Sequence, residues 1–384
     1  MGLTSGWRAS LCLIALSLLC LNLGLPPLQA DGPTLYSSPL DRFGVLVVRD
    51  YGDITDYDVG RLRASWYANW WFDGNPPRPH GMRFMQTIPA STGRSLPDSL
   101  ALQEDLGRAV DANPGSIWLV GNEPDVVHQD NCTPGDYAKI YHDVYWFIKG
   151  RDPTAQLSAA GIVQPTPLRI EWLNRVWQAY FDAYHTEIPV DVWNIHNQIL
   201  CEGCPDMGCG IPPGIEAEYG ERYTIYDNVS LDIFRRHIRY FREWMRARGE
   251  RNKPLIISEY GVLMPSYYLG GGDEAYGDSL VKAYMTGTFT YLLTAVDNQL
   301  GCPADGNRLV QQWAWYSLNE EPYHWETGTG GFNGPLFDWR YPAYPGVITQ
   351  FGLTYAAYTY HLAIRNRSFP LLFSGHRSGV RSTP

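Results

Sequence analysis

Short apolar runs alternate with longer amphipathic stretches along most of the chain. The apolar runs have the length of buried strands, which predicts strands at Phe43–Val48, Leu62–Trp71, Met82–Gln86, Ile117–Val120, Gln156–Val163, Val190–His196, Leu255–Ser258 and Val310–Trp315. Between them, apolar residues recur at helical spacing. This pattern predicts helices near Asp98–Val110, after Thr133-Pro134, after Thr166-Pro167, and at Leu231–Met245, Asp278–Val296 and Val347–Ile364.

Strands that alternate with helices are typical of a (β/α)8 TIM barrel, and eight such units can be counted, with the weakest helical pattern in the first two. The links from strand to helix are long, notably Asn197–Val229, Gly261–Asp273 and Ser317–Pro345. Long loops on one face of a rigid scaffold usually carry function. We therefore expect one catalytic domain at 31–365, with long loops on its C-terminal face and a tail at 366–384.

The first 30 residues have the pattern of a signal peptide. Arg8 precedes the apolar run Leu11–Leu25, and Leu28-Gln29-Ala30 closes the segment. We expect cleavage after Ala30 and a secreted, soluble monomer that has no membrane contact once the leader is removed.

Export changes the interpretation of the cysteines. Five lie beyond the leader: Cys132, Cys201, Cys204, Cys209 and Cys302. Disulfides are the default in an oxidising compartment. The spacing of Cys201, Cys204 and Cys209 would also suit zinc, but no fourth ligand is evident, so we favour disulfides and leave their pairing open.

Composition restricts the class of partner. The formal net charge is −10, which makes nucleic acid and anionic membranes poor partners. Aromatic residues reach 14%, including 14 Trp and 26 Tyr, and flat rings with polar edges suit sugars as well as protein cores. A poly- or oligosaccharide is the expected partner.

Two of the predicted strands end in a glutamate. Glu123 follows Ile117–Val120, and Glu259 follows Leu255–Ser258. In a barrel, strands four and seven face each other across the mouth, so the two carboxylates can meet. Retaining glycoside hydrolysis needs two carboxyl groups about 5–5.5 Å apart. Singly, Glu123 could favour a helix N-terminus and Glu259 could be a solvated loop residue, but together they favour catalysis.

The residues around both glutamates resemble a known group of enzymes. Asn122-Glu123-Pro124 and Ser258-Glu259-Tyr260-Gly261 are similar to the signatures of retaining glycoside hydrolases of clan A. Ser65–Trp70 together with Gly121–Asp125 resembles the glycosyl hydrolase catalytic core family, which includes β-1,3-glucanases. This closer resemblance covers only the first half of the chain. It implies that Glu123 is the acid/base, that Glu259 is the nucleophile and that the substrate is a β-glucan.

Seven further residues are candidates for substrate binding. Asn122 is placed to contact a sugar 2-hydroxyl, and His196 could hold the nucleophile or a substrate hydroxyl, although it could also be structural. Trp315 could stack beneath a sugar or belong to the core. Tyr67 and Asn69 would face the cleft in one register of their strand, and Asn197 and Tyr260 adjoin His196 and Glu259.

Two other functions use the same features. A carbohydrate-binding barrel without catalysis would keep the aromatic residues but would not need both glutamates, whereas a transglycosylase would use the same pair. The sequence contains no glycine-rich phosphate loop, His-Glu-x-x-His or Gly-x-Ser-x-Gly motif, so we expect no cofactor and no metal.

Overall fold

The computed structural model describes residues 35–204, 208–324 and 326–368, and the predicted leader lies outside them. Its strands form one parallel sheet in the order β3-β2-β1-β9-β8-β7-β6-β5-β4. Their bounds are β1 Phe43–Leu46, β2 Trp66–Ala68, β3 Arg83–Phe84, β4 Gln86–Ile88, β5 Ile117–Val120, β6 Gln156–Ile162, β7 Val192–His196, β8 Leu255–Gly261 and β9 Gln312–Tyr316.

The two ends of this sheet are pieces of one predicted strand. β3 pairs with β2 and β4 pairs with β5, and only Met85 separates β3 from β4. The sheet therefore closes on itself as a barrel of eight strand positions, which confirms the predicted TIM-barrel fold.

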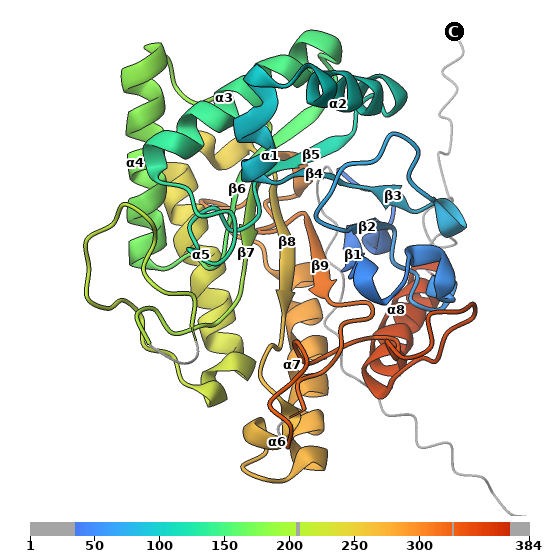
Figure 1. The fold of residues 1–384 in the computed structure, drawn as a ribbon. Helices are drawn as coiled ribbons and strands as arrows, with labels where there is room; N and C mark the ends of the chain where they lie inside the picture. The colour runs from blue at the N-terminus through green and yellow to red at the C-terminus, as the bar shows by residue number, and fades with distance from the viewer. Residues whose placement is uncertain (1–34, 205–207, 325, 369–384) are drawn as a thin grey trace, which may run out of the picture.

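Helices surround the barrel (Figure 1). The α-helices are α1 Ala90–Ser95, α2 Leu100–Ala112, α3 Pro134–Arg151, α4 Pro167–Tyr184, α5 Leu231–Ala247, α6 Ser266–Leu269, α7 Glu274–Thr294 and α8 Gln350–Ser368. The predicted six long helices are confirmed, with shifted ends. Helix α8 continues past the predicted domain end at Arg365, and residues 369–384 of the tail lie outside the described part of the chain.

The count of eight complete strand–helix units was wrong for the first two. Only short 3-10 turns, Arg49–Tyr51, Ile54–Asp56 and Val59–Arg61, link β1 to β2, and the turn Pro79–Gly81 lies between β2 and β3. Proline at positions 76, 77 and 79 explains the second case, since proline removes a backbone donor and clashes inside a helix.

The two predicted Thr-Pro helix starts differ in detail. The Thr133 hydroxyl accepts a hydrogen bond from the backbone N–H of Asp136, as an N-cap does. Thr166 occupies the same position before α4, but its hydroxyl donates to Glu202 at 2.5 Å instead. The second threonine therefore ties a helix to a long loop.

Strand alternation sorts the core into two layers. Inside the barrel pack Leu46, Trp66, Ala68, Met85, Leu119, Val192, Ile256, Ala314 and Tyr316, among others. The intervening residues point outward and fill the larger layer between strands and helices. A residue's place in this alternation decides whether it can reach the mouth of the barrel.

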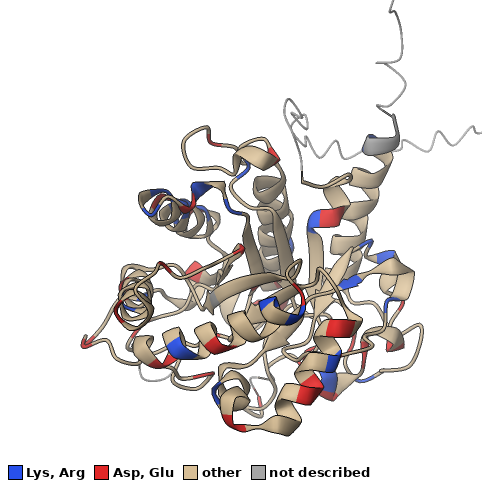
Figure 2. Cartoon of the chain, turned by 90° about the horizontal axis from the view of Figure 1, so that it is seen from above, with Lys and Arg blue, Asp and Glu red and all other residues tan. Residues whose placement is uncertain are grey.

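The long loops leave the barrel at the C-terminal ends of the strands. They are 197–230 after β7, 262–273 after β8 with α6 inside it, and 317–349 after β9. Figure 2 shows the charged residues mainly on the surrounding helices and loops, with both signs interspersed. In the described ranges no helix is both long and apolar enough to cross a membrane.

The barrel interior leaves no room for added volume at β1. A Cβ at Gly44 would lie 2.2 Å from the ring of Trp66, which is fully buried. We expect Gly44→Ala to lower the free energy of unfolding by about 1–3 kcal/mol, because the indole must shift in a packed layer. Chemical denaturation measures this change. Gly150→Ala in α3 is the matched control, since nothing lies within 4 Å of its added methyl group and helix propensity favours alanine. Equal stability of the two variants would contradict this account.

Candidate active site

Glu123 is held by an unusual backbone turn at the end of β5. Gly121 and Glu123 have φ values of 88° and 44°, in the left-handed region. The Glu123 backbone N–H donates to the carbonyl of Gly161 in β6 at 3.1 Å. Gly161 itself has φ 60°, and a Cβ there would lie 2.9 Å from the side chain of Asn194. Two glycines thus allow the chain to turn the carboxylate into the barrel mouth.

Glu259 reaches the mouth through an irregularity in β8. The pairing register of β7 and β8 shifts between Ile195 and His196, so that His196 lies opposite Glu259. Ile257 points outward, and strict alternation would also point Glu259 outward. The extra residue, Ser258, restores Glu259 to the inside, which is a known use of a β-bulge.

His196 lies between the two glutamates, as Glu123 and Glu259 meet across the mouth. Its Nδ1 is 2.8 Å from Oε1 of Glu123 and 3.9 Å from Oε2 of Glu259. One oxygen of each carboxyl group and one ring nitrogen of His196 all lie within 4.8 Å of one another. The carboxyl groups are thus close together, and their exposed fractions are only 7% and 9%.

The two carboxylates differ in their hydrogen-bond donors. Glu259 accepts from Nε1 of Trp70 at 3.1 Å and from Nε2 of Gln198 at 3.2 Å. Among the described side chains, the hydrogen bond found for the Glu123 carboxyl group is the one to His196. Glu259 is therefore the better stabilised anion.

The pKa values of Glu123 and Glu259 follow from their burial and their hydrogen-bond partners. Burial raises the pKa of Glu123 to about 8, against a lowering effect of Arg169. Burial also raises the pKa of Glu259 to about 7, with His196, Trp70 and Gln198 acting in the opposite direction. Burial lowers the pKa of His196, which favours a neutral imidazole. Near neutral pH the arrangement favours a proton on Glu123 before one on Glu259.

A buried ion network fixes the loop that carries Glu123. Arg169 of α4 forms ion pairs with Asp125 at 3.3 Å and with Glu202 at 3.0 Å, and all three side chains are fully buried. Asp125 also accepts from the backbone N–H of Val163 at 3.2 Å. The network joins the Glu123 loop to the long loop after β7. Asp125 is thus a structural residue rather than part of the cleft lining.

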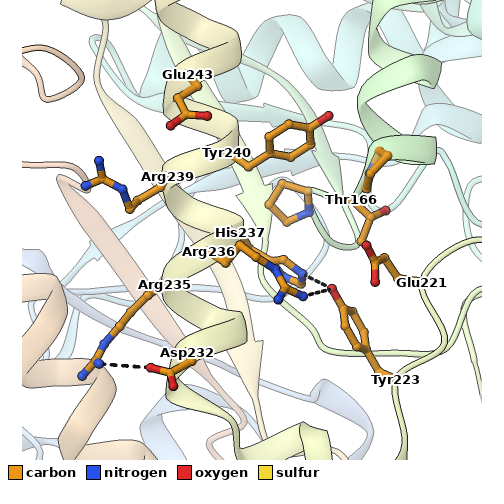
Figure 3. A pocket seen from close by; sticks show the side chains of 12 residues that line it. Thr166, Glu221, Tyr223, Asp232, Arg235, Arg236, His237, Arg239, Tyr240 and Glu243 are labelled. Carbon is orange, nitrogen blue, oxygen red and sulfur yellow. Dashed lines mark hydrogen bonds and ion pairs between the residues drawn. The ribbon is translucent and has the colours of Figure 1, made fainter.

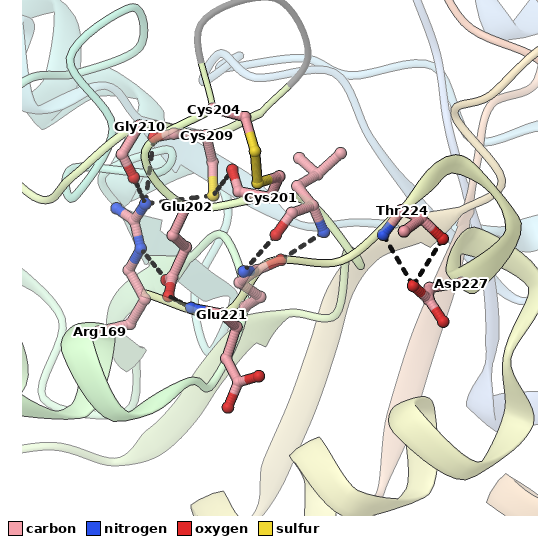
Figure 4. Close-up of a disulfide and its surroundings, with 11 residues drawn as sticks. Arg169, Cys201, Glu202, Cys204, Cys209, Gly210, Glu221, Thr224 and Asp227 are labelled. Atoms are coloured by element: carbon pink, nitrogen blue, oxygen red, sulfur yellow. Dashed lines mark hydrogen bonds and ion pairs between the residues drawn. A yellow bond between two sulfur atoms is a disulfide. The ribbon is translucent and has the colours of Figure 1, made fainter. Parts of the chain in front are cut away.

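The long loop after β7 holds a disulfide between Cys201 and Cys204 (Figure 4). Cys132, Cys209 and Cys302 are buried free thiols. Cys209 lies beside Arg169, with its Sγ 3.1 Å from the guanidinium, and does not join the disulfide. The expectation of a disulfide is confirmed for one pair.

Two of the predicted binding residues line the barrel mouth. Asn122 and His196 surround a hollow together with Leu46, Ala68, Trp70, Thr87, Leu119, Gly121, Asn194, Ser258 and Glu259. The Asn122 side chain is partly exposed and donates to Gln129 at 3.3 Å. Both residues remain candidates for substrate contact.

Five predicted binding residues do not reach this hollow. Trp315 and Tyr260 point outward and pack against each other, with ring centroids 5.5 Å apart. Tyr67 also points outward and donates to the carbonyl of Pro77. Asn69 accepts from the backbone N–H of Trp71, and the fully buried amide of Asn197 bonds Phe234 and His237. We correct the assignment of the buried residues Trp315, Tyr260, Tyr67 and Asn197, whereas Asn69 is partly exposed and stays a prediction.

Three site residues were missed in the sequence. Trp70 follows Asn69 and lies at Glu259, Tyr316 occupies the inward position after the outward Trp315, and the rings of Trp70 and Tyr316 are 5.8 Å apart. The alternation of inward and outward residues along each strand was the available signal, but the wrong set of alternate residues was assigned to the inside. Gln198, in a loop, carried no signal. Its Nε2 bonds Glu259, while its buried Oε1 has no partner among the described residues.

The three central residues also offer two carboxylate oxygens and an imidazole nitrogen, a donor set that could hold a divalent cation. Among the described residues they are the group of three acidic, His or Cys side chains close enough to do so. Nδ1 of His196 and Oε1 of Glu123 instead share a hydrogen bond, so these two atoms have a partner without a cation.

The fold has counterparts of known structure. A GH128 (subgroup II) endo-β-1,3-glucanase from Pseudomonas viridiflava has a TM-score of 0.51 and 18% sequence identity, over 82% of this chain and 97% of that one. A GH128 (subgroup I) endo-β-1,3-glucanase from Amycolatopsis mediterranei, solved in complex with laminaritriose, has a TM-score of 0.51 and 15% identity, over 83% and 99% of the chains.

A third similar structure is a GH128 (subgroup III) curdlan-specific exo-β-1,3-glucanase from Blastomyces gilchristii in complex with glucose. Its TM-score is 0.51 at 14% identity, over 83% of this chain and 98% of that one. The chain matches no protein-family model and no curated protein. At these identities the similarity establishes the fold, and the chemistry must be argued from the site.

The raised pKa values of both glutamates mean that ionising them costs free energy in the folded state. Each glutamate titrates near 4.5 in the unfolded chain and at about 8 or about 7 in the folded one. The folded state therefore holds more protons in this window, and stability is lost as pH rises through it. We expect Glu123→Gln and Glu259→Gln to be more stable than wild type at pH 9, by at least about 2 kcal/mol each.

At pH 4 both forms of each residue are uncharged, so this gain should vanish. Thermal unfolding at the two pH values measures the difference, with the exposed Glu187→Gln as control. A stability difference that is the same at pH 4 and pH 9 would show that burial does not perturb these glutamates.

Proposed function

We propose that this protein is a retaining glycoside hydrolase that cleaves β-glucan, with Glu123 as the acid/base and Glu259 as the nucleophile. The observation that carries the proposal is the unequal pair of buried carboxyl groups. One carboxyl oxygen of each lies within 4.8 Å of the other, which suits retaining enzymes, whose carboxyl groups are about 5–5.5 Å apart. Inverting enzymes need a wider gap for a water molecule.

The roles follow from the hydrogen bonds. A nucleophile must be an anion, and Trp70 and Gln198 both donate to Glu259. An acid must keep its proton near neutral pH, and burial raises the pKa of Glu123 to about 8. His196 forms a hydrogen bond with Glu123 and can orient it, and its Nδ1 lies 3.9 Å from Oε2 of Glu259.

In the first step the Glu259 carboxylate attacks the anomeric carbon of the sugar. The glycosidic C–O bond breaks and the leaving oxygen takes the proton of Glu123. Glycosylation removes the negative charge of Glu259, which lowers the pKa of Glu123 and makes it a base. In the second step Glu123 takes a proton from water, whose oxygen attacks the anomeric carbon and releases Glu259 with retained configuration.

The substrate class rests on two supports. The aromatic pair Trp70 and Tyr316 lies at the mouth beside Glu259, and ring faces suit sugar rings. The similar solved structures are β-1,3-glucanases, and one of them binds laminaritriose. We therefore propose a β-1,3-linked glucan as the preferred substrate. The signal-peptide pattern supports export of the enzyme.

The catalytic pair is tested on a panel of β-1,3-, β-1,4- and mixed-linkage glucans, xylan and mannan. We expect release of reducing sugar from β-1,3-glucan by the wild type. Glu123→Gln and Glu259→Gln should each lose at least about 100-fold in kcat, because each removes a group that acts in the transition state. The exposed Glu187→Gln should retain full activity.

NMR of the first-formed product then reports its anomeric configuration, which should be that of the substrate. Inversion, or full activity of Glu259→Gln, would contradict the proposed mechanism. We also expect activity to survive treatment with a metal chelator. Activity that returned only with an added divalent cation would instead assign the three residues to a metal centre.

The role of Gln198 can be separated from a merely structural one. Gln198→Leu removes a donor to Glu259, so the pKa of the nucleophile should rise. We expect the acidic limb of the kcat/KM profile to move up by about one pH unit, since that limb reports the free nucleophile. Gln178→Leu, on the exposed side of α4, is the matched control. Lower activity with an unmoved acidic limb would make Gln198 structural only.

A further inference from the structure

A second pocket lies outside the barrel, between the start of α4, helix α5 and the loop after β7 (Figure 3). It has a volume of about 510 Å³, which lies within the range of ligand sites in proteins. None of its lining residues belongs to the hollow at Asn122, His196 and Glu259. Its walls include Pro165, Thr166, Pro167, Tyr223, Arg236 and Tyr240.

One end of the pocket lies at the same end of the barrel as the catalytic pair, and Arg239, Tyr240 and Glu243 line it further along α5. Thr166 and Pro167 form the beginning of α4, and Asp232 lies in the first turn of α5. Helices of a (β/α)8 barrel begin at the C-terminal ends of the strands. A long polymer in the barrel mouth can therefore extend along the same face to reach this pocket.

The charges of the pocket balance. Three arginines line it, Arg235, Arg236 and Arg239, together with three acidic residues, Glu221, Asp232 and Glu243. Arg235 pairs with Asp232, and burial lowers the pKa of His237 to about 3, so that this imidazole is neutral. Equal charge of both signs favours a neutral ligand over an anion or a cation.

The floor of the pocket is a fixed hydrogen-bonded structure. Nε2 of His237 is 2.9 Å from the hydroxyl of Tyr223, and its Nδ1 is 2.9 Å from the side-chain oxygen of Asn197. Arg236 also donates to the Tyr223 hydroxyl. His237 is 2% exposed, so the ring of Tyr223 is held from beneath by a buried group. Such a preorganised wall loses little entropy when a ligand binds.

The pocket's chemistry matches that of a sugar. Tyr240 and the two prolines offer apolar surface, and charged side chains of both signs offer donors and acceptors around it. Sugar rings have apolar faces and a rim of hydroxyl groups, which are both donors and acceptors. We propose that this pocket is an accessory binding site for a neutral oligosaccharide, which holds a second stretch of the glucan while the barrel mouth cleaves the first. The glucan identity rests on the proposed function.

The test uses Glu259→Gln, which removes the proposed nucleophile, and laminarihexaose as the probe. Isothermal titration should show two sites in this variant. Adding Tyr240→Ala should weaken one of them at least about tenfold, the effect of one lost aromatic contact. Tyr360→Ala, an exposed tyrosine on α8, is the matched control and should leave both sites intact.

A single site that Tyr240→Ala leaves unchanged, or no binding at all, would overturn the accessory site. Hydrolysis of laminarihexaose by the wild type tests the proposed function separately. Tyr240→Ala in the otherwise wild-type chain should hydrolyse this short substrate at an unchanged rate. The same variant should bind insoluble β-1,3-glucan more weakly than the wild type does.

Discussion

The central constraint of this molecule is the burial of two carboxyl groups next to each other. Glu123 and Glu259 are largely withdrawn from water, and ionising both there is unfavourable. His196 lies between them and forms a hydrogen bond with Glu123, while its Nδ1 is 3.9 Å from Glu259. The surrounding structure is arranged so that one group can hold a proton while the other is stabilised as an anion. This division of roles is what a double-displacement mechanism requires.

Much of the neighbouring structure keeps this pair in place. The buried ion pairs of Arg169 with Asp125 and Glu202 clamp the Glu123 loop to the loop after β7. Removing one partner of such a network leaves a buried charge unpaired, which is strongly destabilising. The disulfide between Cys201 and Cys204 flanks Glu202 in the same loop. The stability of the loop and the geometry of the site therefore depend on the same contacts.

The two binding regions differ in how they are built. The barrel mouth is formed by strand ends and holds buried carboxyl groups with raised pKa values, whereas the pocket on α5 is lined by charged residues of both signs and by tyrosine. We propose bond cleavage for the first and retention of a neutral chain for the second. Their link is Asn197, whose side chain contacts His237 and whose backbone N–H donates to the carbonyl of Glu259.

The sequence by itself determined the barrel, because its parallel strands are buried on both faces and appear as apolar runs. It also located both glutamates and the cap at Thr133, which are local features. It did not determine which side chains face the mouth. The bulge at Ser258 reverses the alternation in β8, and Trp70, which follows Asn69 after β2, lies at Glu259. Gln198 and Trp70 meet Glu259 from separate loops, and such convergence depends on tertiary structure, since no local pattern encodes which distant residues become neighbours.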